Sequence, residues 1–219
     1  MTSSLTKFIA ISLLCAAATA SRAEGPAQKG AATSVTAISP IFGQLVRFSM
    51  PASFIAVSEN TNGQSYIREA VPKGETTEAW TQMITVSGYK GLAGNPNYSP
   101  QGFAEKMAAG FKGACPETFA AKGLGETKFG DQDAFIAVAG CGKINASADG
   151  HSEIALIVIV KGVTDSYTIQ WAERTASRPS APVIDDAKWQ ERLHALMPIR
   201  LCAIVAGEAA PYPSCMQQK

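Results

Sequence analysis

Apolar and polar side chains alternate with a period of two between residues 42 and 89, which predicts strands with one buried face. Turn signals, such as Pro51 and the sequence NTNG at 60–63, separate the alternating stretches. This pattern predicts three or four antiparallel strands that open the domain. They lie in the stretches 42–51, 53–59, 63–72 and 82–89.

The period changes to that of a helix after residue 99. Phe103, Met107 and Phe111 recur every four residues and would form one apolar stripe along a helix. Ser99 is a good N-cap, and Pro100 suits the first helical position. We therefore expect an amphipathic helix that packs on the sheet.

The rest of the chain predicts more strands and a second helix. Strand patterns occupy 118–129, 134–142, 152–162 and 165–174, and the run 154–160 is apolar at nearly every position, as in a central strand covered on both faces. Asp185 can cap a last helix, in which Trp189, Leu193 and Leu196 mark the buried face. The expected class is α+β, a largely antiparallel β-sheet flanked by helices.

The N-terminal sequence predicts export. Lys7 precedes an apolar run from 8 to 18, and small-x-small sites end at Ala20 and Ala23, which is typical of a secretory signal peptide. The run is shorter than the roughly 20 residues that a membrane anchor needs. We expect a signal peptide at 1–23, a flexible leader at 24–40, one domain at 41–200 and a C-terminal tail at 201–219.

Four cysteines remain after the signal peptide, and an even number in an exported chain indicates disulfides. They allow three pairings, of which we favour Cys115 with Cys141 and Cys202 with Cys215, because each closes a short loop and the second would hold the tail. A metal site or redox pair is the alternative, but the chain has no Cys-x-x-Cys motif and no cluster of histidines.

Charge and motifs exclude several functions. With 19 basic and 18 acidic residues the chain is nearly neutral, so we expect no binding to nucleic acid. Neither His151 nor His194 belongs to a spaced metal motif, and we expect no metal and no cofactor. The sequences GLGETK at 123–128 and GCGK at 140–143 lack the remaining glycines of nucleotide-binding loops and are interpreted as turns.

Three carboxylates near a tryptophan are the best catalytic candidates. Glu69, Glu75 and Glu78 could supply the pair of acids that glycoside hydrolysis requires. However, Glu75 and Glu78 flank two threonines in an expected short helical turn. The helix dipole alone favours acidic residues near a helix N-terminus, so their presence there needs no catalytic role. Trp80 would then dock this turn on the sheet, so we interpret the segment as a connection.

A second group of residues indicates binding. Trp171 and Arg174 lie near the end of a predicted strand, and Tyr89 and Tyr98 flank a glycine-rich loop. Aromatic and arginine side chains are common in interfaces. We expect these four residues to form a groove with an aromatic floor near one edge of the sheet.

The order of elements resembles the PsbP-like superfamily, which includes DcrB-like proteins. The resemblance rests on VRFSMPASFIAV at 46–57, on the helix SPQGFAEKMAAGF at 99–111, and on the pair SEIALIVIV and DSYTIQWAE at 152–160 and 165–173, and it covers about 42–198. It implies an α-β-α sandwich with an accessory or binding role and without an active site.

From these features we expect a periplasmic or secreted, non-enzymatic accessory protein. It would bind a protein or an envelope component through the sheet edge and the loop at 88–102, with no transmembrane span after removal of the signal peptide. Two alternatives remain open. One is a hydrolase that uses a carboxylate or His151, and the other is a carrier of a small ligand.

Overall fold

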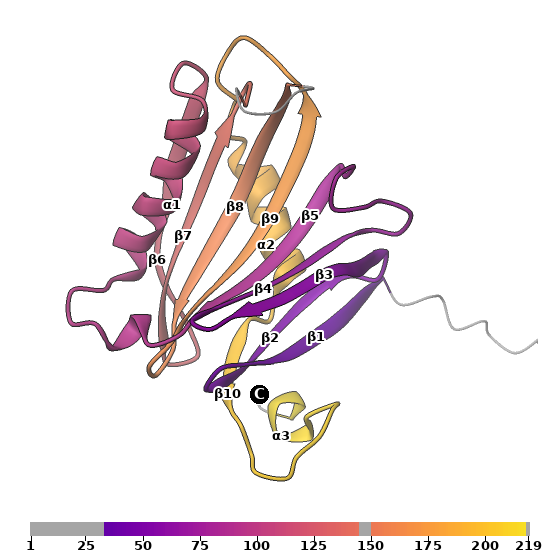
Figure 1. Cartoon of the computed structure of the whole chain (residues 1–219), viewed down its shortest axis with the longest axis vertical. Coiled ribbons are helices and arrows are strands. Elements are labelled where there is room, and N and C mark those ends of the chain that lie inside the picture. Colours follow the sequence, from indigo (N-terminus) through magenta and orange to yellow (C-terminus); the bar gives the residue numbers. More distant parts are fainter. Residues whose placement is uncertain (1–32, 145–149, 218–219) are drawn as a thin grey trace, which may run out of the picture. The chain divides into compact units, whose positions relative to one another are not determined.

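A computed structural model describes residues 33–144 and 150–217, which form two antiparallel sheets and their helices (Figure 1). The expected signal peptide at 1–23 and most of the expected leader lie outside the described residues. Seven strands form the large sheet in the order β3-β4-β5-β9-β8-β7-β6. Their bounds are β3 Phe54–Asn62, β4 Ser65–Pro72, β5 Gln82–Tyr89, β6 Phe119–Phe129, β7 Gln132–Cys141, β8 His151–Lys161 and β9 Ser166–Ala176.

β8 is the most deeply buried strand of the large sheet. Its side chains from Ala155 to Val160 are at most 1% exposed. Leu156 and Val158 face one core cluster, whereas Ala155 and Ile157 face another. The apolar run in the sequence therefore forms a strand covered on both faces, as predicted.

Helix α1 (Pro100–Ala114) covers one face of the sheet over β7 and β8. Ser99 caps it as predicted, because the Ser99 side chain accepts a hydrogen bond of 3.0 Å from the backbone N–H of Gly102. Phe103, Met107 and Phe111 pack against the alanine-rich side of β7 and β8. The small side chains on these strands allow the helix to approach the sheet closely.

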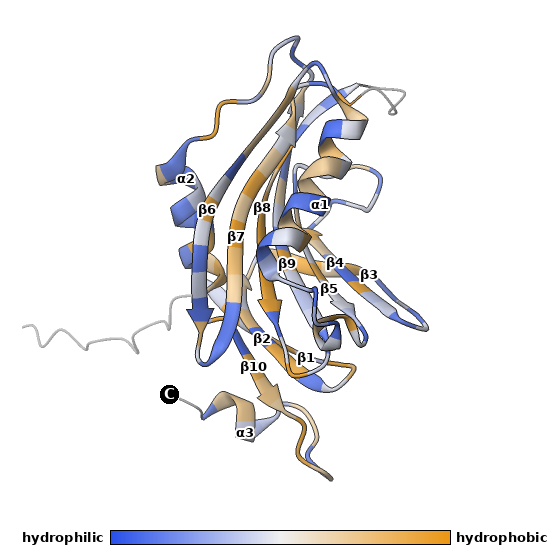
Figure 2. Ribbon diagram, turned by 90° about the vertical axis from the view of Figure 1, so that its left-hand side faces the viewer, coloured by the Kyte–Doolittle hydropathy of each residue, from blue (hydrophilic) through white to orange (hydrophobic). Residues whose placement is uncertain are grey.

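The opposite face carries helix α2 (Asp186–Leu196) and a three-stranded sheet, so that α1 and α2 lie on either side of the large sheet (Figure 2). The small sheet has the order β1-β2-β10, with β1 Ser34–Ile41, β2 Gln44–Pro51 and β10 Arg200–Ala203. Asp185 caps α2, as predicted, by accepting hydrogen bonds from the backbone N–H groups of Ala187 and Lys188. The class is α+β, mostly antiparallel.

The structure differs from the expected boundaries at both ends of the domain. Residues 34–40, expected in a flexible leader, form most of β1, because β1 pairs along its whole length with β2. The C-terminal tail contains β10 and a short helix, α3 (Pro213–Met216). Residues 123–128, interpreted as a turn, lie inside β6, where a bulge at Gly123–Gly125 shifts the register.

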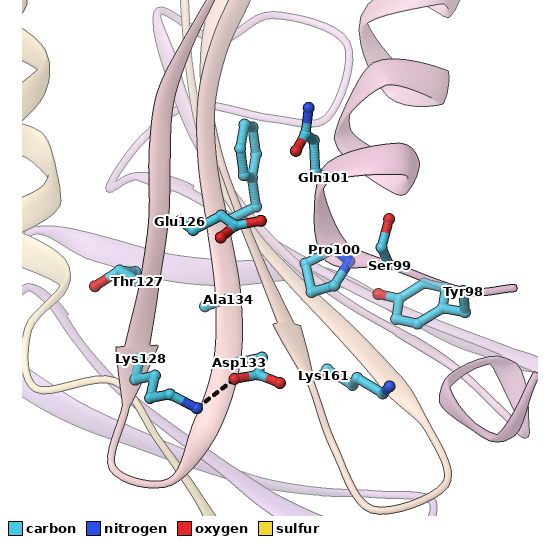
Figure 3. Close-up of a pocket in the computed structure, with 11 residues that line it drawn as sticks. Tyr98, Ser99, Pro100, Gln101, Glu126, Thr127, Lys128, Asp133, Ala134 and Lys161 are labelled. Atoms are coloured by element: carbon cyan, nitrogen blue, oxygen red, sulfur yellow. Dashed lines mark hydrogen bonds and ion pairs between the residues drawn. The ribbon is translucent and has the colours of Figure 1, made fainter. Parts of the chain in front are cut away.

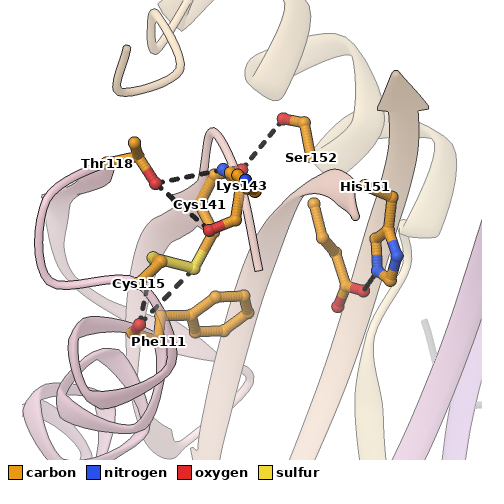
Figure 4. The surroundings of a disulfide bond; sticks show 8 residues. Phe111, Cys115, Thr118, Cys141, Lys143, His151 and Ser152 are labelled. Carbon is orange, nitrogen blue, oxygen red and sulfur yellow. Dashed lines mark hydrogen bonds and ion pairs between the residues drawn. A yellow bond between two sulfur atoms is a disulfide. The ribbon is translucent and has the colours of Figure 1, made fainter. Parts of the chain in front are cut away.

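Both favoured disulfides are present. Cys115 is bonded to Cys141, and Cys202 is bonded to Cys215. The first bond joins the end of α1 to the end of β7, and Ser152 of β8 donates a hydrogen bond of 2.9 Å to the Cys141 carbonyl beside it (Figure 4). The second bond joins β10 to α3 and holds the tail, as expected.

An ion-pair cluster joins α2 to β9. Glu173, whose side chain is 11% exposed, accepts hydrogen bonds from Lys188 and Arg192. Burial by itself would raise the pKa of Glu173, but the bonds from Lys188 and Arg192 outweigh it and lower the pKa below its ordinary value of 4.5. The charged form of Glu173 therefore stabilises the packing of α2 on the sheet.

Replacing Glu173 with glutamine is expected to lower the free energy of unfolding by about 2 kcal/mol at neutral pH, because two half-buried cations lose their partner. Because the pKa of Glu173 is lower in the folded state than in the unfolded state, its charged form stabilises the fold above the unfolded-state pKa. This stabilisation is lost as the pH falls through the folded-state pKa. Denaturant titrations should therefore show that the difference between wild type and Glu173→Gln shrinks below about pH 4.5.

The matched control is Glu191→Gln, on the same helix but with a side chain that is 75% exposed. An exposed pair contributes little, so this variant should unfold like the wild type. Equal losses in the two variants would contradict the role assigned to Glu173.

None of the helices in 33–144 and 150–217 combines the length and the apolar composition needed to cross a bilayer.

Candidate functional site

A cleft of about 500 Å³ lies between the N-terminus of α1 and the strands β6, β7 and β8 (Figure 3). We call it the α1 cleft. Its volume is within the usual range of ligand sites. Its lining residues are Tyr98, Ser99, Pro100, Gln101, Glu126, Thr127, Lys128, Asp133, Ala134, Phe135 and Lys161.

The β-sheet register places three charged residues in one row along the bottom of the α1 cleft. Asp133 of β7 is paired with Lys128 of β6 on one side and is level with Lys161 of β8 on the other. Directly opposed residues in antiparallel strands have Cα atoms about 5 Å apart. Two lysines therefore flank one aspartate on the same face of the sheet.

Lys128 and Asp133 form an ion pair within this row. The hydrogen bond and the charge of Lys128 hold the pKa of Asp133 below its ordinary value, and Lys161 acts in the same direction. Asp133 is consequently ionised at neutral pH. A general acid needs a raised pKa instead, so this carboxyl is not suited to that role.

Two charged side chains of the cleft lie on strands that are not neighbours, Glu126 on β6 and Lys161 on β8. Lys161 is half-buried and Glu126 is exposed, and within the described residues neither side chain forms a hydrogen bond or an ion pair, although the charge of Lys161 acts on Asp133. Phe135, opposite Glu126 in the register, is 9% exposed and supplies an apolar floor. Mixed charges above an aromatic floor suit the binding of a polar ligand.

A buried carboxylate fixes the loop that forms one wall of the cleft. Asp165 is 4% exposed and accepts hydrogen bonds from the backbone N–H groups of Gly91 at 2.7 Å and Gly43 at 3.1 Å. Gly91 has a φ of 73°, which glycine adopts without strain. Asp165 thereby joins the β8–β9 turn, the β1–β2 turn and the connection from β5 to α1.

Two of the four predicted binding residues meet at this wall. Tyr89 and Tyr98 both contact Phe103 of α1, with ring centroids 4.9 Å and 6.1 Å apart, respectively. The Tyr98 hydroxyl is hydrogen-bonded to Ser166. Tyr98 lines the cleft directly, and Tyr89 supports the helix behind it.

The other two predicted binding residues lie elsewhere, so the expected groove with an aromatic floor is not formed. Trp171 is 3% exposed and packs edge-on against Phe54 in the core on the α2 side. Arg174 is on the other face, with its guanidinium carbon 3.7 Å from the centre of the Trp80 ring. In β9, Arg174 is eight positions from Ser166, the residue that pairs with Tyr89. Eight residue rises place Arg174 roughly 26 Å along the strand from Tyr89. β5 and β9 are also interior strands, not an edge of the sheet.

Two of the catalytic candidates, Glu75 and His151, make local side-chain contacts. Glu75 accepts two hydrogen bonds of 2.7 Å from Thr81, one from its backbone N–H and one from its hydroxyl, and so closes its loop. The expected short helical turn is wrong, because residues 73–81 form turns and bends. Trp80 is buried on the sheet as predicted, which agrees with a connection. His151 contacts Glu153, which also accepts a hydrogen bond from Arg174.

The charged residues of the α1 cleft were not predicted from the sequence. A period of two along β6 and β7 could have shown that Glu126 and Lys128 share one face, and that Asp133 and Phe135 share one face. Lys161 joins them only through the pairing of β7 with β8. Across the described chain, no group of three or more His, Cys, Asp or Glu side chains could hold a metal ion.

The sequence matches no protein-family model and no curated protein. The Ran-binding protein Mog1p of Saccharomyces cerevisiae is a similar solved structure, with a TM-score of 0.42 and 12% identity over 73% of this chain and 91% of that one. A structure from Bacteroides thetaiotaomicron has a TM-score of 0.37 and 13% identity over 74% of this chain, which spans 46% of that chain. A mutant of protein Mog1 has a TM-score of 0.37 and 11% identity, covering 75% and 86% of the two chains. Similarities at this level assign neither a family nor a function to the chain.

Proposed function

We propose that the protein is an exported, non-enzymatic accessory protein of the cell envelope that binds a protein partner through the α1 cleft. The observation that carries the proposal is the cleft itself, about 500 Å³ in volume, with a glutamate on β6, a lysine on β8 and an aromatic floor. It includes residues 98–101, which belong to the loop expected to bind from the sequence.

The electrostatics of the cleft favour binding over hydrolysis. Asp133 is held in its charged form by Lys128, and Ser99 is engaged as the cap of α1. The cleft therefore offers charged contacts and no activated nucleophile among its lining residues. A site of this kind can recognise a partner by charge complementarity.

Two further features support the setting of the proposal. The disulfides Cys115–Cys141 and Cys202–Cys215 suit an oxidising compartment, such as the periplasm or the exterior of the cell. In this proposal the large sheet, with α1 on one face and α2 on the other, corresponds to the α-β-α sandwich of the PsbP-like superfamily that the sequence resembles.

Photo-crosslinking in intact cells tests the proposal. A photoreactive phenylalanine derivative in place of Gln101, within the cleft, is expected to capture one recurrent protein. The matched control places the same group at Val183, which is 83% exposed in the connection before α2. Capture of the same proteins at both positions, or of none at position 101, would count against a partner-binding cleft.

A further inference from the structure

The α1 cleft has a defined polarity. On the β8 side, Lys161 contributes a half-buried cation whose side chain forms no hydrogen bond or ion pair within the described residues, and α1 presents its N-terminus at Ser99, Pro100 and Gln101. The N-terminus of a helix carries partial positive charge and free backbone N–H groups. The backbone N–H of Gln101 forms no hydrogen bond within the described residues, whereas that of Gly102 bonds to Ser99.

Glu126 gives the β6 side of the cleft the opposite charge. Lys128 does not neutralise it, because Lys128 is paired with Asp133 across the β6–β7 hairpin. The row of Lys128, Asp133 and Lys161 therefore retains one positive charge at its β8 end, and Glu126 supplies one negative charge above Phe135. Figure 3 shows Glu126 and Lys161 on different strands, on either side of Asp133.

The separation of Glu126 and Lys161 across the sheet sets the size of a matching ligand. Two strand spacings of about 4.8 Å and two residue rises of about 3.3 Å place the Cα atoms of Glu126 and Lys161 roughly 12 Å apart. An extended peptide advances about 3.3 Å per residue, and only side chains an even number of residues apart share a face, so this distance corresponds to roughly four residues. A single small anion would leave Glu126 without a partner.

We infer that the α1 cleft selects an extended peptide segment in which an acidic and a basic side chain are four residues apart. The acidic group binds Lys161 and the N-terminus of α1, the basic group binds Glu126, and the residues between them lie over Phe135. This inference rests on the proposed function and specifies which part of a protein partner is recognised.

Nuclear magnetic resonance titration of the isotope-labelled protein with three synthetic peptides tests the inference. The first peptide is a capped, otherwise uncharged hexapeptide with one glutamate and one lysine four residues apart. In the second peptide the glutamate is replaced by glutamine, and in the third the lysine is replaced by glutamine. The first peptide should shift the amide signals of Gln101, Glu126 and Lys161. It should bind about tenfold more tightly than either of the others, because only it makes both charge contacts and also meets the N-terminus of α1.

Charge reversal in the protein gives the second arm of the test. Lys161→Glu should lose the tenfold preference and bind more tightly a peptide in which the glutamate is replaced by lysine. The matched control is Lys106→Glu, which makes the same change on the exposed side of α1, outside the cleft. The control should behave like the wild type, and added salt should weaken the preference.

The outcomes separate this inference from the proposed function. Equal binding of all three peptides, or no shift at the cleft at the solubility limit of the peptides, overturns the inference. Crosslinking from position 101 that is unchanged by Lys161→Glu also overturns it while leaving the proposed function intact. If free glutamate shifts the cleft signals as strongly as the first peptide does, the site takes a small ligand and the peptide inference is wrong.

Discussion

Replacing Asp165 with alanine is expected to lower the free energy of unfolding by about 3 kcal/mol, because it removes two backbone hydrogen bonds to a buried, charged acceptor. The donors are the backbone N–H groups of Gly43 and Gly91. The Tyr167 hydroxyl, 3.4 Å from Asp165, keeps its bond to the Ile41 carbonyl. Denaturant titration measures the loss.

A local effect should accompany the loss of stability. Asp165 joins three turns, one of which leads to the Tyr98 wall of the α1 cleft, so amide hydrogen exchange at Gly43 and Gly91 should accelerate in the variant. Asp131→Asn is the matched control, since Asp131 is exposed in the β6–β7 turn and its loss should change stability by no more than about 0.5 kcal/mol. Wild-type stability of Asp165→Ala, or unchanged exchange at Gly91, would refute this role.

Replacing both Cys115 and Cys141 with serine is expected to cost about 3.5 kcal/mol in the free energy of unfolding. The bond closes a loop with a sequence separation of 26, and its removal releases conformational entropy in the unfolded chain. The measurement is a denaturant titration of the double variant and of the wild type under non-reducing conditions.

Reducing agent provides the control for the double variant. It should destabilise the wild type but should affect the variant only through the remaining Cys202–Cys215 bond, which spans a sequence separation of 13. Because Cys115 follows α1 directly, the variant should also show faster exchange in the last turn of that helix. A variant as stable as the oxidised wild type would contradict the prediction.

Some residues of the site could be expected from the sequence, because the physics that places them is local. The cap at Ser99 and the proline at position 100 mark the start of α1 through the needs of the first helical turn. Tyr98 was therefore assigned correctly to a loop beside a helix. Trp171 and Arg174 were assigned wrongly to one surface, although residues three apart on a strand point to opposite faces.

Other features depend on contacts between distant segments. Asp165 has the sequence context of an ordinary exposed turn, and it is buried because the turns at Gly43 and Gly91 close over it. The first strand was mistaken for part of a leader because its small and polar residues give no clear alternation. Pairing with β2 nevertheless provides its backbone with hydrogen bonds.

By itself the sequence determined the α+β class, the two helices with their caps, the doubly covered strand β8 and the favoured disulfide pairing, because each follows from local periodicity, capping chemistry or loop length. Only the tertiary structure decided the order of the strands and the α1 cleft. Lys128, Asp133 and Lys161 form one row because the registers of β6, β7 and β8 align them. Register is a property of paired strands, so no single segment contains it.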